Sequence, residues 1–482
     1  MEIYIKNIRE ADCVCDALVL PSAEKDTVFY KNLHPSVSSL IKRLFSKEFS
    51  GKQNEVLLIP APDDIKAERI LLVGLGRKDQ VSADKVRQAG GKASGYLRDM
   101  GMKSIALSTL ALSSFKISPS VFIEGALLGL YKFNRYKAGN NNRKIDGFTL
   151  LSKASKGLDE ELKWAGIICS SVNFTRDMVN TPANDMTPTH LAKAALSLKG
   201  KKLTVKVLEA KDAKKLGMGA YLSVARGSEE PSRFIVLEYK GTKAAPVVLI
   251  GKAITFDSGG ISLKPAESME KMKYDMAGGA AVLGIFKAVA ELELPVHIVG
   301  ILPATENLPG GAASKPGDVI RTIEGKTVEI INTDAEGRLV IADAIGYAKR
   351  FNPRLIIDIA TLTGACSIAL GNEAVAMAGN NGELLDKMRE SAHNTYERVW
   401  EMPLYEEYRE YLKSDIADIK NSGGKNGSLV TSAYFLHEFT GDVPWVHLDI
   451  AGTAWVDKEK PYIPKGASGI GVRLILDLLR RL

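Results

Sequence analysis

Cysteine, uninterrupted apolar sequence and a dominant charge are all scarce in this chain of 482 residues. Its cysteines, Cys13, Cys15, Cys169 and Cys366, are too few and too dispersed for a disulfide framework or a thiolate zinc site, which indicates a reduced, cytoplasmic setting. Charged residues interrupt every apolar run well before the roughly 18 residues of a membrane span, so we expect no membrane partner. The N-terminal sequence lacks the basic and apolar regions of a secretory signal.

The charge balance gives little support to nucleic acid as a partner. Lys and Arg number 64 against 57 Asp and Glu, a net charge of +7, and the two signs are mostly interleaved. Nucleic-acid-binding proteins usually concentrate their basic residues on one surface. The densest basic stretches, residues 198–206 and the segment around Arg143, are therefore interpreted as solvated faces or turns.

The N-terminal third of the chain alternates strand-like and helix-like segments. Aliphatic runs predict strands at 55–59, 69–73, 104–108 and 148–151, and helices are predicted at 86–100 and 118–136. Ser82 stands where the N-cap of the first helix belongs. Gly74-Leu75-Gly76 lacks the third glycine of a dinucleotide-binding fingerprint and is interpreted as a plain turn. The alternation predicts an α/β domain with a mostly parallel sheet.

A long helical pattern at about 158–179 follows and ends in a Pro- and Asn-rich breaker at 180–188. Strands are then predicted at 203–210, 233–239, 247–252, 297–302, 327–332, 355–360 and 445–451, with helices at 277–292 and 338–351. We therefore predict an α/β protein of two domains. These are a smaller N-terminal α/β domain (1–155), a connecting helix and breaker (156–185), and a larger C-terminal catalytic α/β domain with a mixed central sheet (186–482).

Several familiar motifs fail on inspection. The sequence DSGG at 257–260 resembles the surroundings of a trypsin-like nucleophile, but that enzyme class needs an all-β fold. Gly251-Lys252 lacks the earlier glycine and the following Ser or Thr of a phosphate-binding loop. The six histidines form no HExxH or other close pair.

Acidic and lysine residues instead gather where strands end. Lys252 follows the strand at 247–251, the usual ligand side of an open α/β sheet, and Asp257 comes shortly after it. Asp275 precedes a predicted helix that begins with small residues. Asp334 and Glu336 lie between a strand and a helix, where an extended backbone would project both to the same side.

Four carboxylates in one cleft would repel one another strongly unless cations neutralise them. An oxygen-rich ligand set without histidine suits Mg²⁺ or Mn²⁺, with Zn²⁺ and Co²⁺ as alternatives. Two metal ions about 3.5–4 Å apart are a common device for activating water against a carbonyl or phosphoryl centre. Each acid taken alone has a plainer interpretation, an N-cap or a surface salt bridge.

The sequence NTDAEGRL at 332–339 resembles the signature of the leucyl aminopeptidase family, the dimetal cytosol aminopeptidases. The resemblance continues through GKAITFDSGGISLK (251–264), MKYDMAGGAA (272–281), TENLPGG (305–311), ATLTGA (360–365) and HLDIAGTAW (447–455). It covers about residues 170–482 in consistent order and spacing, whereas the N-terminal region carries no comparable motif.

The resemblance implies two divalent metal ions in each subunit. Asp257 and Glu336 would bridge them, Lys252 and Asp275 would complete the tighter site, and Asp334 would complete the looser one. Lysine ligates only as a neutral amine, so the adjacent dications must displace its proton. A salt bridge between Lys252 and one of the acids is the alternative.

The resemblance also implies catalytic roles for two basic residues. Lys264 would direct its charge at the scissile carbonyl and its developing oxyanion. Arg338 would hold a bicarbonate ion that serves as general base, which fits the lack of a free His or Glu in these motifs. The alternative for Arg338 is a helix-terminal residue paired with an acid.

The family positions that line the substrate pocket correspond to Met272, Thr361, Gly364 and Ala451, with Leu362 contributing backbone groups only. Methionine is an adaptable wall, so broad tolerance with a preference for Leu-like N-terminal residues is expected. Ordinary core packing is the alternative for these side chains.

The resemblance therefore implies a cytoplasmic metallo-aminopeptidase that acts on short peptides and assembles as a homohexamer. Three alternatives stay open: an additional or principal DNA-binding role, a different dimetal hydrolase such as a phosphoesterase, and a metal-free structural subunit.

Overall fold

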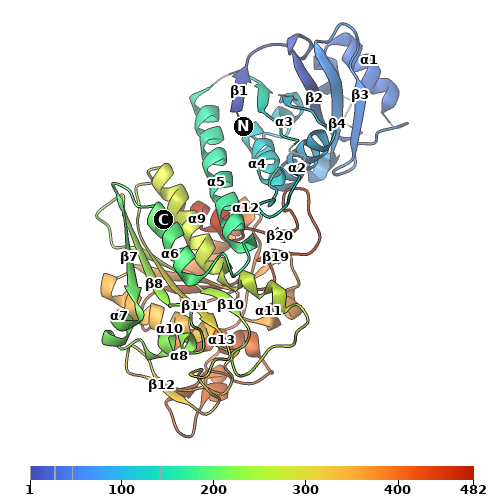
Figure 1. Ribbon diagram of the computed structural model, residues 1–482. Coiled ribbons are helices and arrows are strands. Elements are labelled where there is room, and N and C mark those ends of the chain that lie inside the picture. Colours follow the sequence, from blue (N-terminus) through green and yellow to red (C-terminus); the bar gives the residue numbers. More distant parts are fainter. Residues whose placement is uncertain (1, 26–28, 46, 140–142, 154) are drawn as a thin grey trace. The chain divides into compact units, whose positions relative to one another are not determined.

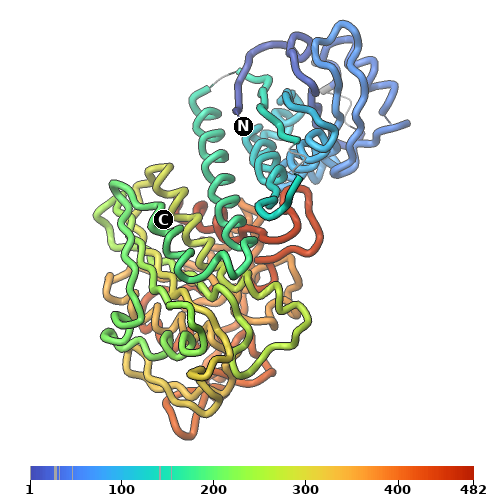
Figure 2. The backbone as a smooth tube through the Cα atoms, in the orientation of Figure 1, coloured from blue at the N-terminus to red at the C-terminus, as the bar shows by residue number. Residues whose placement is uncertain are grey.

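The computed structural model describes residues 2–25, 29–45, 47–139, 143–153 and 155–482 (Figure 1). The chain forms two compact units, one of Met1–Ser170 with Lys458–Lys465 and one of Ser171–Asp457 with Gly466–Leu482. Figure 2 shows the late segment of the first unit, in red, beside the end of helix α4 (Pro119–Gly129), where the Pro461 carbonyl oxygen would lie 2.9 Å from a Cβ built on Gly129. In the part of the chain that the structure describes, no helix is both long and apolar enough to cross a bilayer.

A six-stranded sheet forms the centre of the first unit, in the order β1-β6-β5-β2-β4-β3. Every neighbouring pair is parallel except β3 and β4, so the predicted mostly parallel sheet is confirmed. The strands are β1 (Glu2–Lys6), β2 (Cys15–Glu24), β3 (Val56–Pro60), β4 (Ala67–Arg77), β5 (Ser104–Ser108) and β6 (Gly147–Leu151). Besides α4, the helices are α1 (Pro35–Leu44), α2 (Ala83–Asp99), α3 (Leu110–Ser114) and the long α5 (Lys156–Asn180), which continues into the second unit.

Alternation along β2 explains why both faces of this sheet are covered. Ala17 and Val19 lie in a core shared with α2 and α4, whereas Leu18 and Leu20 lie in a second core shared with α1. Successive strand residues point to opposite faces, so a strand that is apolar throughout requires cover on both sides. Ser82 accepts a hydrogen bond from the Lys85 amide, which confirms it as the N-cap of α2.

Two local predictions in this unit are wrong. The glycine pair at 74–76 lies inside β4 rather than in a turn. Glycine is needed at position 74 because a Cβ there would lie 1.8 Å from the Lys52 carbonyl oxygen. The helix predicted at 118–136 ends at Gly129. Tyr131 and Phe133 continue the apolar pattern as half-buried residues, and periodicity alone does not distinguish a helix from a loop that buries them.

The second unit contains a nine-stranded sheet in the order β16-β15-β18-β14-β9-β11-β8-β7, with β10 paired to β11. Its strands are β7 (Leu203–Glu209), β8 (Arg233–Lys240), β9 (Val247–Gly251), β10 (Ala253–Asp257), β11 (His297–Asn307), β14 (Leu355–Ala360), β15 (Val375–Gly379), β16 (Val399–Glu401) and β18 (Trp445–Asp449). The pairs β7–β8, β8–β11 and β15–β18 are antiparallel and the others are parallel, which confirms the predicted mixed sheet.

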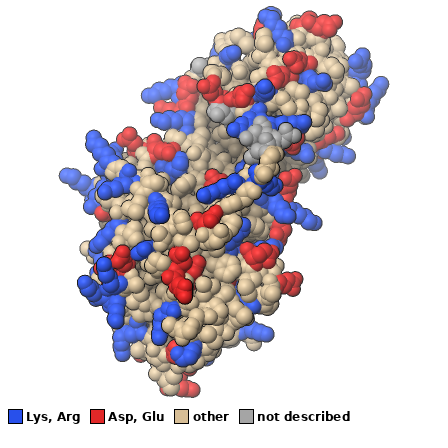
Figure 3. All heavy atoms as spheres, in the orientation of Figure 1, with Lys and Arg blue, Asp and Glu red and all other residues tan. Residues whose placement is uncertain are grey.

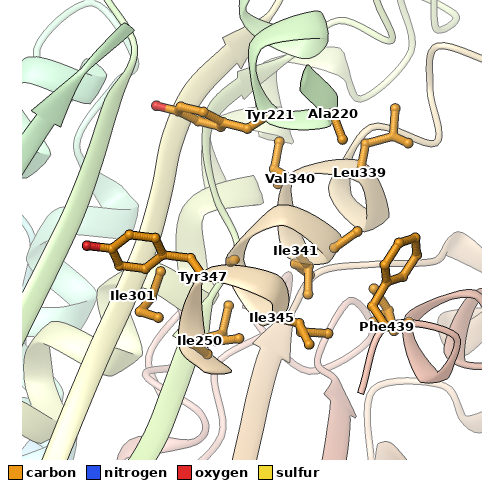
Figure 4. Close-up of a cluster of buried hydrophobic side chains, with 14 of the residues drawn as sticks. Ala220, Tyr221, Ile250, Ile301, Leu339, Val340, Ile341, Ile345, Tyr347 and Phe439 are labelled. Carbon is orange, nitrogen blue, oxygen red and sulfur yellow. The ribbon is translucent and has the colours of Figure 1, made fainter. Parts of the chain in front are cut away.

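Helices pack against the strands of this sheet or against one another. They are α6 (Pro188–Ser197), α7 (Ala210–Lys215), α8 (Gly219–Ala225), α9 (Ala277–Glu291), α10 (Gly337–Ala348), α11 (Gly364–Leu370), α12 (Gly382–Thr395), α13 (Ser428–His437) and α14 (Val472–Arg481). Val340, Ile341 and Ile345 of α10 meet Ile250 of β9 and Ile301 of β11 in the main core (Figure 4). This packing fixes the start of α10 against the strand ends.

The segment 327–332, which was predicted as a strand, is mostly irregular. Only β13 (Thr327–Glu329) forms, and it belongs to a small separate sheet with β12 (Val319–Arg321) and β17 (Ile419–Lys420). A further two-stranded sheet contains β19 (Trp455–Val456) and β20 (Gly466–Ala467).

Candidate metal centre

Four strands of the large sheet place polar residues at one edge. The parallel pairing of β9, β14 and β18, and of β10 and β11, directs their carboxyl ends the same way. Lys252 follows β9, Asp257 ends β10, Thr361 follows β14 and Asp449 ends β18. The edge at which an open α/β sheet usually binds ligands therefore carries the predicted chemistry.

Three carboxylates converge at this edge. Asp257, Asp334 and Glu336 offer oxygen atoms that all lie within 4.8 Å of one another. Asp257 and Glu336 are buried, and Asp334 is half-buried. Like charges at this separation disfavour joint ionisation unless positive charge lies among them.

Two lysines lie among these carboxylates. Lys252 Nζ is 2.8 Å from Asp275 Oδ2 and 2.7 Å from Glu336 Oε1, and it donates to the Thr361 carbonyl oxygen at 2.9 Å. Lys264 Nζ is 2.9 Å from Asp257 Oδ2 and also forms an ion pair with Asp334. The structure thus brings all five residues predicted as metal ligands, together with Lys264, into one cluster, which we call the carboxylate–lysine cluster.

Electrostatics within the cluster favour bound cations. Burial raises the pKa of Asp275, Glu336 and Asp334, and the negative charge of Asp257 raises the pKa of all three further. Burial alone would lower the pKa of Lys252, but the surrounding carboxylates, Asp275 first, outweigh it and raise that pKa. The protein groups alone therefore leave the carboxyls short of positive charge.

The donor set fits divalent metal ions. Glu336 Oε2 is buried and has no hydrogen-bond partner among the described residues, although its other oxygen pairs with Lys252. A buried carboxylate oxygen without a partner is costly unless a cation or water occupies its free lone pairs. Four carboxylates and one amine supply the hard ligands that divalent ions take.

The backbone around the signature departs from the predicted extended form. Asp334 lies in a turn, and Glu336 is the N-cap residue of α10 with helical dihedral angles, φ −76° and ψ −35°. The turn rather than a strand end therefore makes the two acids converge. Glycine is needed at position 337 because the Lys252 side chain passes next to it: a Cβ at this position would lie 2.8 Å from Lys252 Nζ.

Arg338 is buried one residue further along α10. Its Nη1 donates to the Asn421 carbonyl oxygen at 2.7 Å, while its Nε has no hydrogen-bond partner among the described residues. Burial lowers the pKa of Arg338 to about 10. No ion pair of Arg338 with an acid occurs in the described parts of the chain, so its guanidinium keeps donors for another group.

The residues predicted to line the substrate pocket differ in their contacts and in the space around them. Thr361 is committed to the cluster, since its Oγ1 donates to Asp275 Oδ1 at 2.7 Å. The amides of Leu362 and Ala451 both donate to Asp449 Oδ1 at 3.1 Å, which ties the ends of β14 and β18 together. Gly364 begins α11 with no heavy atom within 4 Å of a built Cβ, so it faces open space. Met272 is half-buried in the 3₁₀ helix Met269–Met276, three residues before Asp275.

Three supporting residues were not singled out by the sequence. Asn307 donates to Asp257 Oδ1 at 2.8 Å and to the Thr333 carbonyl oxygen at 3.0 Å, and so orients one acid. Asp449 accepts from Thr363 Oγ1 at 2.7 Å besides its two amides. These two lie inside the motifs TENLPGG and HLDIAGTAW, which were a usable signal. Asn421, which supports Arg338, lies in no such motif.

Comparisons with known proteins agree with this geometry. Residues 173–476 match the cytosol aminopeptidase family, catalytic domain, and residues 19–140 match the N-terminal domain of the same family. A probable cytosol aminopeptidase of Geotalea uraniireducens is 45% identical over 464 residues, 94% of each chain. Among solved structures, a tomato leucine aminopeptidase mutant is similar with a TM-score of 0.89 and 33% identity, covering 100% of this chain and 97% of that one. The bottromycin maturation enzyme BotP in complex with Mn has a TM-score of 0.86 and 30% identity, covering 97% and 99%.

Proposed function

Because the chain belongs to the cytosol aminopeptidase family and is a metal-dependent aminopeptidase, we propose that its reaction takes place at the carboxylate–lysine cluster. The observation that carries this proposal is the convergence of Asp257, Asp334 and Glu336 within 4.8 Å, at the strand ends where Lys252 and Asp275 also lie. So much negative charge in a buried position is accounted for by bound metal ions.

The proposed ligand set follows the contacts of each side chain. Asp257 and Glu336, the two most buried members of the trio, would hold both ions. Lys252 and Asp275, whose Nζ and Oδ2 atoms lie 2.8 Å apart, would complete the tighter site, and the half-buried Asp334 would complete the looser one. Two divalent ions held here supply Lewis-acid polarisation of the substrate carbonyl and an activated water. We propose Mn²⁺ or Zn²⁺, with Mg²⁺ and Co²⁺ as alternatives; the similar enzyme BotP forms a complex with Mn.

The two basic residues act on the reacting groups. With Asp257 and Asp334 engaged in ligation, the ammonium of Lys264 is left to donate to the scissile carbonyl oxygen and to stabilise the developing oxyanion. Arg338, whose Nε has no partner within the described chain, would hold a bicarbonate ion, which would supply the general base.

The substrates proposed are short peptides with a free α-amine and a Leu-like N-terminal side chain. The open space at Gly364 accommodates that side chain, and Met272, Thr361, Leu362 and Ala451 form the rest of the pocket. A cytoplasmic location and a homohexamer are part of the same proposal and rest on the family resemblance. The relatives named above are aminopeptidases or a maturation enzyme, and none of their names supports DNA binding or phosphoester hydrolysis.

The test is hydrolysis of Leu-p-nitroanilide by purified protein before chelation, after chelation, and after addition of Mn²⁺, Zn²⁺, Mg²⁺ or Co²⁺. We expect chelation to abolish turnover and at least one ion to restore it, and Asp257→Ala to stay inactive with every ion. Activity that resists thorough chelation would refute the proposal.

A further inference from the structure

A large basic pocket in the first unit is not used by the peptidase reaction. It has a volume of about 940 Å³, and all of its lining residues belong to Met1–Ser170 or Lys458–Lys465. The walls are the C-terminal half of α2, the end of α4 with the segment after it, and residues 459–465. A volume of this size lies within the range of small-molecule sites.

The lining carries a strong excess of positive charge. Two acidic residues, Asp99 and Glu459, face six basic ones, namely Lys92, Arg98, Lys132, Lys137, Lys460 and Lys465. Asp99 is already paired with Arg98 at 2.9 Å and with Lys132 at 3.5 Å. Within the described residues, Lys92, Lys137 and Lys465 form no ion pair, so three ammonium groups are available to an anion.

Aromatic residues lie among these charges. Tyr96, Tyr131 and Phe133 line the same pocket and are half-buried. Aromatic rings offer flat faces to a planar ligand group, and lysine ammonium groups bind phosphate as point charges. The combination suits a ligand that carries both a planar ring and a phosphate.

Specific contacts between α2 and the segment 459–465 fix the wall of the pocket. A Cβ on Gly91 would lie 2.2 Å from the Pro461 carbonyl oxygen, so glycine permits the late segment to pack directly on α2. The Tyr462 hydroxyl donates to Oδ1 of the buried Asp84 at 2.6 Å. The guanidinium carbon of Arg87 lies 5.9 Å from the centre of the Tyr462 ring. These contacts hold the wall in place before any ligand binds, which reduces the cost of ordering it.

We propose that this pocket binds a nucleoside monophosphate or a closely similar phosphate ester of a planar ring, one per chain. The lysines hold the phosphate, and Tyr96, Tyr131 and Phe133 contact the ring. The site is independent of the metal centre, since none of its lining residues belongs to the carboxylate–lysine cluster.

Substitutions in the pocket lining test this proposal. Gly95 lines the pocket, and a Cβ built on it meets no atom within 4 Å, so a side chain can leave the backbone there and Gly95→Trp directs a bulky ring into the pocket. Lys92→Gln with Lys137→Gln removes charge and leaves the shape intact. Lys42→Gln, an exposed residue of α1 in the same unit, is the matched control.

The measurement is calorimetric titration of the metal-loaded, full-length enzyme with AMP, adenosine and inorganic phosphate at low and raised salt. AMP should bind more tightly than adenosine or phosphate, and its affinity should fall as salt screens the lysines. Gly95→Trp should lose AMP binding while keeping Leu-p-nitroanilide hydrolysis, which shows that the fold is intact. The double lysine variant should bind AMP about fivefold more weakly and adenosine unchanged.

Equal affinity of AMP and adenosine would overturn the proposal, as would AMP binding that survives in Gly95→Trp, because that would place the nucleotide elsewhere, for example on the metal ions. If Gly95→Trp also loses peptidase activity, the double lysine variant decides: AMP binding equal to that of Lys42→Gln would refute the site.

Discussion

Lys252 and Lys264 lie in one cluster, yet their exposure separates their roles. The Lys252 side chain is 3% exposed and is enclosed by Asp275, Glu336 and the Thr361 carbonyl, so only a small ion could reach its amine. The Lys264 side chain is 20% exposed and forms ion pairs with Asp257 and Asp334. We therefore expect a substrate carbonyl to approach Lys264 rather than Lys252.

This difference predicts how Lys264→Gln behaves. The variant should keep its metal content, because Lys264 is not among the proposed ligands, but lose the cation that is proposed to stabilise the oxyanion. We expect kcat to fall about 10²–10³-fold, the usual effect of removing one oxyanion donor. Steady-state kinetics and metal analysis of the same preparation measure both quantities, with exposed Lys315→Gln as the control. An unchanged kcat would remove Lys264 from the mechanism.

Asp343 is a second residue whose burial has a measurable consequence. It is fully buried on α10 and accepts hydrogen bonds from the Tyr221 and Ile323 amides, each at 2.8 Å. Burial raises the pKa of Asp343 to about 7, from the 3.8 of an ordinary aspartate. The folded protein therefore holds a proton between these pH values that the unfolded chain has released.

The contribution of Asp343 to the free energy of unfolding should be constant below pH 4 and should fall as the pH rises from 4 to 7. A decline of roughly 2–4 kcal/mol is expected from a shift of this size. Urea titrations across this range should show that Asp343→Asn, which cannot ionise, lacks that decline. A variant with the same pH dependence as the wild type would contradict the assignment.

At the scale of elements, the start of α11 is proposed to shape the substrate pocket. Thr363 caps this helix by accepting from the Cys366 amide, and Gly364 follows with open space beside it. Asn381 and Gly382 repeat this arrangement at the start of α12, again with open space beside the glycine. The two positions thus form a matched pair, only one of which is proposed to contact substrate.

Gly364→Val should therefore narrow the pocket and change specificity. The ratio of kcat/KM for Leu-p-nitroanilide to that for Ala-p-nitroanilide should fall about tenfold or more, since one or two methylene groups discriminate by that order. Gly382→Val should leave the ratio unchanged. Equal ratios in both variants would exclude Gly364 from the pocket.

Strong, long patterns predicted the elements that position the site, and weak ones did not. The helices α9 and α10 and the strands β9, β14 and β18 were predicted because their apolar runs are nearly continuous. The irregular backbone at 330–336 was not, because turns that place Asp334 and Glu336 depend on distant partners such as Asn421 and on the contact of Thr333 with Gly259. The buried Asp358 pairs with His447 at 2.6 Å and with Trp445 at 2.8 Å across two strands, a contact that no local pattern encodes.

At the scale of the whole molecule, charge is dispersed rather than concentrated. Basic and acidic side chains are interspersed over the face drawn in Figure 3, as the sequence predicted. The exposed apolar side chains include Ile261, Leu263, Ile368 and Trp400. Exposed apolar residues of this size are common where subunits associate.

The proposed homohexamer is tested at this scale. Sedimentation equilibrium of the metal-loaded enzyme should give six times the mass of the chain over the concentration range used for assays. A monomeric mass that coincides with full peptidase activity would contradict the assembly and leave the metal centre unaffected.

Anomalous X-ray scattering from crystals grown with Mn²⁺ locates the proposed metal ions directly. We expect two anomalous peaks about 3.5–4 Å apart, with Asp257 and Glu336 touching both, Lys252 and Asp275 touching one, and Asp334 touching the other. Data in which these five side chains surround no anomalous peak, from crystals whose dissolved enzyme hydrolyses Leu-p-nitroanilide, would contradict it.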